Sequence, residues 1–328
     1  MAETKEQIES KKRSGWIAFR GTGPGLLGFS LLLLVSSALL FIPLPFVTTG
    51  LRKWFYRNLE ITHKGQRVAV SFDGRGIDLL KYWIPSLALL TISAGALYWG
   101  IEGKADGFMT FLLIVISVAS LIPLAWLWTA KKRYTVAHTR VAAGTATWQL
   151  SFSGRGATAL WHGMKGIFSL CVMALPLPWA IVGALKWNVE STEIGGKDTS
   201  FKATFSGTGA SLFWYGIGIS ISPLFLFLIL PALLRGLIAW AARFVNIVGL
   251  QRTIEFEFRG VSGPLFGYVY LTLAICIGAL ILNYVLGRIG VPEGGLFAAV
   301  VFWFVITVPF VKASFLRWCA SKIDIVEK

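Results

Sequence analysis

Two arginines lie inside glycine turns that have the features of an anion site. The two turns consist of Gly74, Arg75 and Gly76, and of Gly154, Arg155 and Gly156. Each separates a strand-like segment from an apolar run, and backbone N–H groups at a helix start favour anions that glycine allows to approach closely. We therefore treat both turns as a hypothetical contact for lipid head groups or phosphate. The alternative is that glycine serves only the change from strand to helix, and five copies of the turn favour that architectural role.

The carboxylates do not form a recognisable catalytic site. Six of them lie in polar segments: Glu60, Asp73, Asp78, Glu193, Glu255 and Glu257. Glu255 and Glu257 are two residues apart on a predicted strand, so they share a face and repel one another. The sequence has no Gly-x-Ser-x-Gly or His-Glu-x-x-His phrase, no Walker A phrase and no spaced dinucleotide fingerprint. We therefore expect that the protein is not an enzyme.

Cysteine and histidine give no sign of a metal site. The three cysteines lie in or beside apolar segments without forming a Cys-x-x-Cys pair, and the three histidines show no ligand spacing. These residues are Cys171, Cys276 and Cys319, and His63, His138 and His162. A small apolar side chain is the ordinary role of such a cysteine. We expect no cofactor, no metal and no disulfide.

The composition indicates an integral membrane protein. Of 328 residues, 55% are apolar and 14% are charged, and the mean hydropathy is +0.68. Soluble proteins carry about 25% charged residues, and these values also exclude disordered, collagen-like and disulfide-rich secreted chains. A net charge of +15 is explained by the Lys and Arg that membrane proteins gather in cytoplasmic loops and near anionic lipid. We expect membrane lipids as partners and no nucleic acid.

Seven apolar segments are close to the length of a membrane span, which needs about 20 residues. They are 25–50, 82–101, 108–130, 166–185, 210–234, 264–287 and 294–311. None contains Asp, Glu, Lys, Arg or His, which lowers the expectation of a proton-coupled pump. The first segment is too long for the core of a cleavable signal peptide. We expect residues 1–15 to be a retained polar tail and residues 16–328 to form a single membrane domain.

The most specific feature of the sequence is an internal repeat. A phrase with a Phe-x-Gly core precedes an apolar segment five times, and its phenylalanines are 53, 80, 53 and 53 residues apart. They are Phe19, Phe72, Phe152, Phe205 and Phe258. The spacing of 80 equals 53 plus 27, which is about one further membrane segment with its loop. The chain is interpreted as five tandem units that start near residues 16, 66, 146, 200 and 253.

Prolines give the repeat a second landmark. A proline lies 24 residues after the phenylalanine in units one and three, and 51 residues after it in units two and five. These residues are Pro43 and Pro176, and Pro123 and Pro309. In the fourth unit, Pro231 matches Pro45 and Pro178.

Basic and aromatic residues follow the prolines, and alternating residues then flank a glycine turn, which is typical of a hairpin. We expect each unit to contain a β-hairpin, a Gly-x-Gly turn, a membrane helix or helix pair, a break at proline and an interfacial helix. The predicted fold is therefore a mainly α-helical integral membrane protein.

The phrases Phe19-Arg-Gly-Thr-Gly23, Trp54-Phe-Tyr-Arg-Asn-Leu-Glu60 and Gly65-Gln-Arg67 resemble those of the YjgN-like bacterial inner-membrane proteins. That family is defined by a domain of unknown function, and the resemblance covers most of the chain. Its usual Thr-Leu-Gly-Ile-Tyr phrase before the proline is replaced here by Leu39-Leu-Phe-Ile42, which makes this chain a divergent member. The resemblance implies a multi-pass protein of the bacterial cytoplasmic (inner) membrane and implies no activity.

Two classes of function remain open. One is the transport or movement of a small molecule or lipid through the repeated helices. The other is a membrane scaffold or accessory subunit whose cytoplasmic hairpins dock a protein partner, or that assembles as a homo-oligomer. A continuous polar cavity near the serines of the apolar segments would favour transport, and a closed apolar core would favour the scaffold.

Two topologies fit the sequence. Basic residues are dense at 51–81, 131–165 and 235–260, and these regions should be cytoplasmic. The apolar segments are either seven single spans, or the short units are re-entrant hairpins with every Phe-x-Gly turn in the cytoplasm. The repeat favours the second topology. In it, residues 322–326 pair with residues 16–19, because each of these strand-like segments lacks the other half of a hairpin, and the repeats close into a ring or compact cluster.

Overall fold

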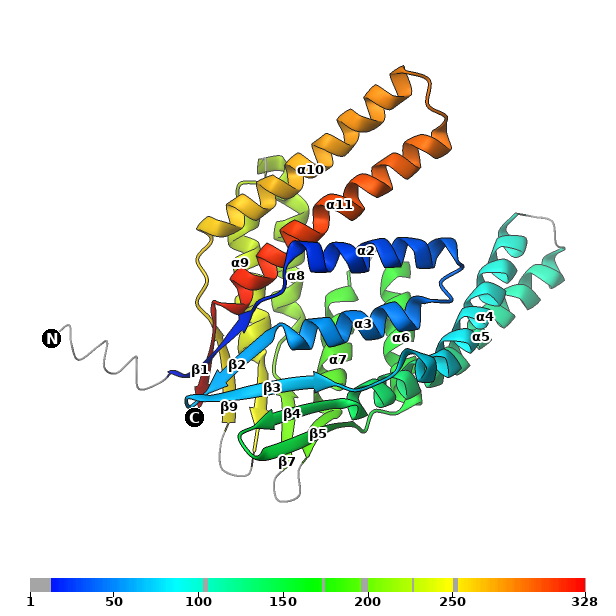
Figure 1. Cartoon of the computed structure of the whole chain (residues 1–328). Coiled ribbons are helices and arrows are strands. Elements are labelled where there is room, and N and C mark those ends of the chain that lie inside the picture. Colours follow the sequence, from blue (N-terminus) through cyan, green and yellow to red (C-terminus); the bar gives the residue numbers. More distant parts are fainter. Residues whose placement is uncertain are drawn as a thin grey trace.

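The computed structural model describes residues 13–102, 106–172, 175–195, 200–225, 227–249 and 253–327. Its strands form one closed barrel, and its helices project from the barrel in pairs (Figure 1). The order strand, helix, helix, strand recurs five times along the chain, and we number these runs units 1 to 5. Most of the expected polar tail lies outside the described residues.

The bounds of the elements are as follows. Unit 1 contains β1 (Arg13–Phe19), α2 (Gly23–Ala38), α3 (Leu44–Arg57) and β2 (Leu59–His63). Unit 2 contains β3 (Gln66–Phe72), α4 (Gly76–Ile101), α5 (Gly107–Ala137) and β4 (Thr139–Ala143). Unit 3 contains β5 (Ala146–Phe152), α6 (Gly156–Cys171), α7 (Leu177–Glu190) and β6 (Thr192–Gly195). Unit 4 contains β7 (Ser200–Phe205), α8 (Gly209–Ile221), the 3₁₀ helix η1 (Ser222–Phe225), α9 (Leu230–Phe244) and β8 (Val245–Val248). Unit 5 contains β9 (Thr253–Phe258), α10 (Gly263–Arg288), α11 (Glu293–Ala320) and β10 (Ile323–Glu327).

Hairpins connect each unit to the next one. The strand pairs β2–β3, β4–β5, β6–β7 and β8–β9 are antiparallel and lie where the glycine turns predicted them. Within a unit the first and last strands also pair, across the base of the helix pair. Sequence neighbours along the whole barrel are therefore spatial neighbours.

The two ends of the described chain close the barrel. Strand β1 pairs antiparallel with β10, with Gly15 opposite Ile325 and Trp16 opposite Asp324. This confirms that the two segments pair, but β10 pairs with Arg13–Trp16, and the rest of β1 pairs with β2 alone. The paired residues of β1 lie earlier in the chain than the expected residues 16–19, because the strand begins at Arg13.

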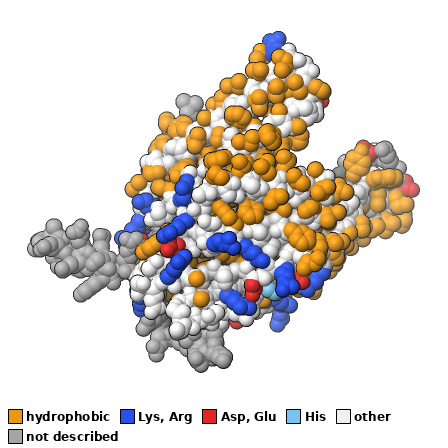
Figure 2. Space-filling model, viewed as in Figure 1, with side chains coloured by type: hydrophobic (Ala, Val, Ile, Leu, Met, Phe, Trp, Pro, Cys, Tyr) orange, Lys and Arg blue, Asp and Glu red, His pale blue; other side chains and the backbone are white. Residues whose placement is uncertain are grey.

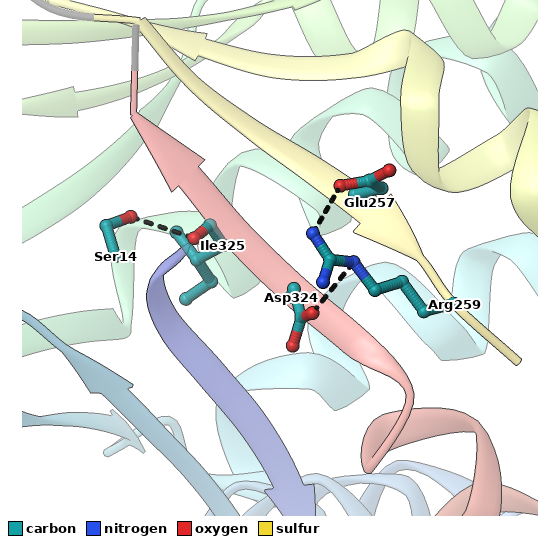
Figure 3. Close-up of polar contacts among 5 residues, drawn as sticks. All are labelled: Ser14, Glu257, Arg259, Asp324 and Ile325. Atoms are coloured by element: carbon teal, nitrogen blue, oxygen red, sulfur yellow. Dashed lines mark hydrogen bonds and ion pairs between the residues drawn. The ribbon is translucent and has the colours of Figure 1, made fainter. Parts of the chain in front are cut away.

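Polar contacts accompany this closure (Figure 3). The hydroxyl of Ser14 donates to the carbonyl oxygen of Ile325 over 2.8 Å. Arg259 lies between two carboxylates, with its Nε 3.1 Å from Asp324 and its Nη2 3.2 Å from Glu257. Asp324 is buried, whereas the Arg259 side chain is 42% exposed, so the ion pair is only partly shielded from water; it ties β10 to the end of β9.

The barrel is apolar inside and polar outside. On β3, Val68, Val70 and Phe72 alternate with the more exposed Arg67 and Ser71. The cross-strand pairs extend the inner face around the whole barrel through Ile17, Ile61, Val68, Val70, Val141, Trp148, Leu150, Ile194, Phe201, Ala203, Ile247, Ile254, Phe256 and Ile325. The outer face carries charged and polar side chains such as Arg67, Arg140, Glu193, Lys202 and Glu257.

Among the described residues, four helices are long and apolar enough to cross a membrane: α4, α5, α10 and α11. They form the two long helix pairs that extend farthest in Figure 1. The seven apolar segments are therefore not seven equivalent helices. Three of them, 25–50, 166–185 and 210–234, are each divided between two shorter helices, and the helix pairs of units 1, 3 and 4 result.

The predicted break at proline holds in units 1, 3 and 4, where α9 begins at Leu230 next to Pro231, and is wrong in units 2 and 5. Pro43 and Pro176 cap the starts of α3 and α7, where the chain turns back. Pro123 and Pro309 instead lie inside α5 and α11 without ending them. Pro43 and Pro176 belong to a Pro-Leu-Pro phrase, whereas the proline inside α5 or α11 removes one backbone hydrogen bond, which a long apolar helix tolerates.

Candidate functional site

The five Phe-x-Gly turns form a ring where the helices meet the barrel. Each phenylalanine ends the first strand of its unit and is at most 8% exposed. In four units its ring meets a tryptophan edge-on, with centroids 5.6, 5.7, 5.8 and 5.7 Å apart. The pairs are Phe19–Trp54, Phe152–Trp187, Phe205–Trp240 and Phe258–Trp318. The tryptophan comes from the second helix of the same unit, so the pair fixes that helix on its strand.

Trp318 is the member of this set that sequence reasoning missed. Trp54 and Trp187 lie eleven residues after Pro43 and Pro176, but the same count from Pro309 leads to residue 320, which is alanine. The structure matches Pro309 to Pro45 instead, because Trp318 lies nine residues after Pro309 and Trp54 nine after Pro45. The spacing of nine also separates Pro178 from Trp187 and was the available signal.

Packing explains the glycines of the predicted anion turns. A Cβ on Gly74 would lie 2.4 Å from the Phe72 ring, and one on Gly154 would lie 2.5 Å from the Phe152 ring. The second glycine of each turn lies against an aromatic ring of the preceding unit, and a Cβ there would be 2.7 Å from that ring. These second contacts are Gly76 with Phe46 and Gly156 with Trp126.

Arg75 and Arg155 lie at the N-caps of α4 and α6 with exposed side chains. In unit 2 the backbone N–H of Arg75 donates to the hydroxyl of Tyr134 over 3.0 Å, and that hydroxyl donates to Asp78 over 2.9 Å. The first turn of α4 therefore already holds a hydroxyl and a carboxylate of the chain itself. Anion binding at the two turns stays a prediction.

Basic side chains gather next to the turn ring, mainly on the second helices. We call this set the basic belt: Arg52, Lys53, Arg57, Lys131, Lys132, Arg133, Lys186, Arg235, Arg243, Lys312 and Arg317. Figure 2 shows Lys and Arg between the hydrophobic helices and the barrel. Two of them hold the next unit's turn: Arg133 donates to the carbonyl of Gly154 over 3.1 Å, and Arg235 to that of Gly260 over 2.7 Å.

The belt is most concentrated between α3 and α5. The guanidinium of Arg52 lies 5.8 Å from the centre of the Phe72 ring, and its buried Nη1 has no hydrogen-bond partner among the described residues. Burial lowers the pKa of Arg52 below its usual value. Lys131 and Lys132 lie close enough to Arg52 for charge repulsion. Such a cluster attracts an anion to the outer edge of the turn ring.

Three apolar cavities lie between the helices on the far side of the belt. One of about 500 Å³ lies between α5, α6 and α7 and includes His162 stacked on Trp187. A second of about 420 Å³ lies between α9, α10 and α11, and one of about 360 Å³ between α2, α3 and α11. These volumes fall within the range of small-molecule sites, which is about 300 to 1,000 Å³.

The serines of the apolar segments do not line a polar passage in the described structure. Ser36 and Ser169 are buried and donate to carbonyl oxygens of their own helices. Ser93, Ser117 and Ser120 bond to one another between α4 and α5. Their hydroxyls are used in holding helices together.

Within the described residues, no three His, Cys, Asp or Glu side chains lie close enough to hold a metal ion. Comparisons with protein-family models, curated proteins and solved structures found no match for this chain. The resemblance to the YjgN-like proteins therefore stays a prediction that rests on the sequence phrases alone.

Proposed function

We propose that this protein handles lipid in a bacterial cytoplasmic membrane, taking a membrane lipid between its helices and holding the apolar part of that lipid toward the interior of the barrel. The observation that carries the proposal is the continuous apolar inner face of a barrel whose outer face is polar. A soluble barrel also has an apolar core. In this protein, however, the barrel adjoins the ends of apolar helices, so we infer that its apolar inner face continues into the apolar surface that faces the membrane.

The tips of the helix pairs support a membrane position with the barrel on the basic, cytoplasmic side. The long pairs end in charged tips, which include Glu102 and Asp106 in unit 2 and Arg288 and Glu293 in unit 5. The tip of unit 1, residues 39–43, carries only apolar side chains. Charged tips suit the far surface of a bilayer, and apolar tips suit its core. This arrangement is the re-entrant topology, with basic residues and both chain ends on the cytoplasmic side.

Lipid fits the cavities better than a small polar solute does. The cavities are apolar, and the Ser30 and Thr272 hydroxyls that line two of them already donate to carbonyl oxygens of their own helices. The basic belt offers charge at the height of lipid phosphates, where each Lys or Arg near an anionic leaflet contributes about 1 kcal/mol. The role that we propose is binding and movement, without catalysis.

The scaffold function is the second candidate, and one feature limits it. Every described strand has two neighbours in the closed barrel, so no strand edge is left for a partner to extend. A protein partner, or a second copy, would have to dock on the polar outer face of the barrel. The scaffold function therefore predicts contacts on the outer face of the barrel and the lipid function predicts contacts on its inner face, so an experiment can distinguish them.

We further propose that the chain consists of five tandem units in a single membrane domain and is a divergent YjgN-like protein. The recurring strand, helix, helix, strand order and the four matching Phe–Trp pairs support the tandem units. The quoted sequence phrases support the family.

Adjacent positions on β3 test the lipid proposal. A photoreactive phenylalanine analogue replaces Val70 on the inner face or Ala69 on the outer face, and the membrane-embedded protein is irradiated. We expect lipid adducts by mass spectrometry from position 70 and few from position 69. Absence of lipid adducts at position 70 would contradict the proposal, and a protein adduct at position 69 would favour the scaffold.

A further inference from the structure

An aromatic ring locks most units to the next one. It stands eight residues before the tryptophan or tyrosine that recurs in the second helix of each unit, and it lies against the second turn glycine of the following unit. A Cβ on that glycine would lie only 2.4 to 2.7 Å from the ring. The locks are Phe46 on Gly76, Trp126 on Gly156, Trp179 on Gly209 and Phe310 on Gly23. The last of these joins unit 5 to unit 1, so the lock is a property of the ring and not only of sequence neighbours.

The junction between units 4 and 5 has no such lock. The position that holds a ring elsewhere is Ala232, eight residues before Trp240, and it is exposed. On the facing side, a Cβ on Gly263 would meet nothing within 4 Å. The turn before α10 is also one residue longer than the others, because Val261 and Ser262 separate its glycines. At this junction, therefore, the sequence lacks the aromatic residue and the structure lacks the ring–glycine contact that the other four junctions have.

The apolar cavity of about 420 Å³ lies at this junction. Leu234 of α9 and Val269 of α10 form its walls, and α11 closes it from behind. Of its described lining residues only Lys312 carries a charge, and Lys312 also lines the cavity shared with α2 and α3.

The charge lies in the half of the cavity nearer the barrel, where Phe315 is the lining residue of α11 that lies closer still. Lys312 is eight residues from the end of α11, at the barrel, whereas Phe304 is sixteen residues from it. At about 1.5 Å per residue, the cavity extends along α11 roughly 12 Å from Lys312 to Phe304, away from the barrel. One charge from the basic belt in the barrel half of the cavity, with an apolar lining beyond it, matches the polarity of one phospholipid molecule.

We propose that the α9–α10 junction is a lateral portal that binds one anionic phospholipid, with its phosphate on Lys312 and an acyl chain between the two helices. The portal rests on the proposed lipid function and names the place where lipid enters. The four locked junctions keep their helices in contact, and the absence of the ring at Ala232 leaves this one junction open to the membrane.

Restoring the missing lock tests the portal. A photoreactive phenylalanine analogue at Leu273, which lines the cavity, reports lipid in nanodiscs of phosphatidylglycerol and phosphatidylethanolamine. The same analogue at the exposed Leu271 of α10 is the control, since that side chain is not among the cavity residues. We expect position 273 to crosslink mainly phosphatidylglycerol, and Ala232→Trp to abolish most of that crosslinking while leaving position 271 unchanged.

Lys312→Gln is the second variant, because an exposed lysine can be replaced without disturbing the fold. We expect it to reduce the preference for phosphatidylglycerol at position 273 about tenfold, the ratio that the loss of one charge-assisted hydrogen bond gives. If neither variant changes crosslinking at position 273, the portal is refuted. If lipid adducts still form at position 70 in that case, the proposed lipid function stands without the portal. If position 70 gives no lipid adducts but Lys312→Gln does lower the phosphatidylglycerol preference at position 273, the portal stands and the barrel interior is refuted as the place where lipid is held.

Discussion

The first glycine of each Phe-x-Gly turn stands against the phenyl ring two residues before it. At residue 74 there is no room for a methyl group beside the Phe72 ring, and the same holds at Gly154 beside Phe152. The Phe-x-Gly repeat could be read from the sequence because glycine and phenylalanine recur at fixed spacing. The physical reason for the repeat could not be read from the sequence, because the contact between the phenylalanine ring and the glycine of its own turn leaves no periodic pattern in the sequence.

Gly74→Ala should destabilise the protein. The added methyl group displaces the Phe72 ring from its site under the turn, and such overpacking costs about 1–3 kcal/mol. Gly95→Ala, in the middle of α4 with nothing within 4 Å, is the matched control and should stabilise by up to about 1 kcal/mol. Thermal unfolding in detergent measures both. Equal effects of the two variants would contradict the packing role of Gly74.

The short helix pairs are the elements whose stability in lipid needs most explanation. Their second helices have 14, 14 and 15 residues, or about 21 to 23 Å, less than the hydrocarbon core of about 30 Å. The turn between α2 and α3 places Leu40 and Phe41 at φ of 51° and 59°, a left-handed conformation that costs roughly 1 kcal/mol or more per residue. Hydrogen bonds compensate, since the N–H of Phe41 donates to Ser36 over 2.7 Å.

Trp83→Phe should loosen the α2–α3 tip. The indole N–H of Trp83 in α4 donates to the carbonyl of Phe41 over 2.9 Å, and that carbonyl also accepts the backbone N–H of Leu44 over 3.1 Å. Because the variant removes one of two hydrogen bonds, we expect a loss of about 0.5–1.5 kcal/mol and faster hydrogen exchange at residues 39–43. Trp99→Phe, an exposed tryptophan of the same helix, is the control and should change neither. Unchanged exchange at the tip would show that its backbone is satisfied without Trp83.

The hairpins are the elements that sequence reasoning located best, and the helices are those it located worst. Alternation around Gly65 and Gly144 marks two hairpin turns, and both glycines have positive φ, which few other residues adopt readily. Proline was ambiguous, because Pro123 lies inside a helix and Pro43 caps the start of one. Pro231 also stands at a helix start without a Pro-Leu-Pro phrase, so proline alone could not decide it.

At the scale of the whole molecule, one inference from unpaired strands reached farther than any motif. Two strand-like segments without partners, near residues 16–19 and 322–326, predicted that the ends meet, and β1 and β10 do pair. The complete barrel and its apolar interior were beyond reach. They depend on the register of ten strands together, and a shift of one residue reverses which face is inside.

The barrel and the helix tips together predict the topology of the chain. Every Phe-x-Gly turn lies at the barrel end of its helix pair, so all five should face the cytoplasm if the short pairs are re-entrant. In a chain without its three cysteines, single cysteines replace Thr22, Thr208 or Glu102, all of them exposed. A membrane-impermeant maleimide on intact cells should label only position 102, at the tip of the long pair in unit 2. Permeabilised cells should allow labelling at 22 and 208 as well. Labelling of position 22 or 208 from outside would mean that the short units cross the membrane once, and the barrel would then have strands on both sides of the bilayer, which its continuous hydrogen-bonded ladder forbids.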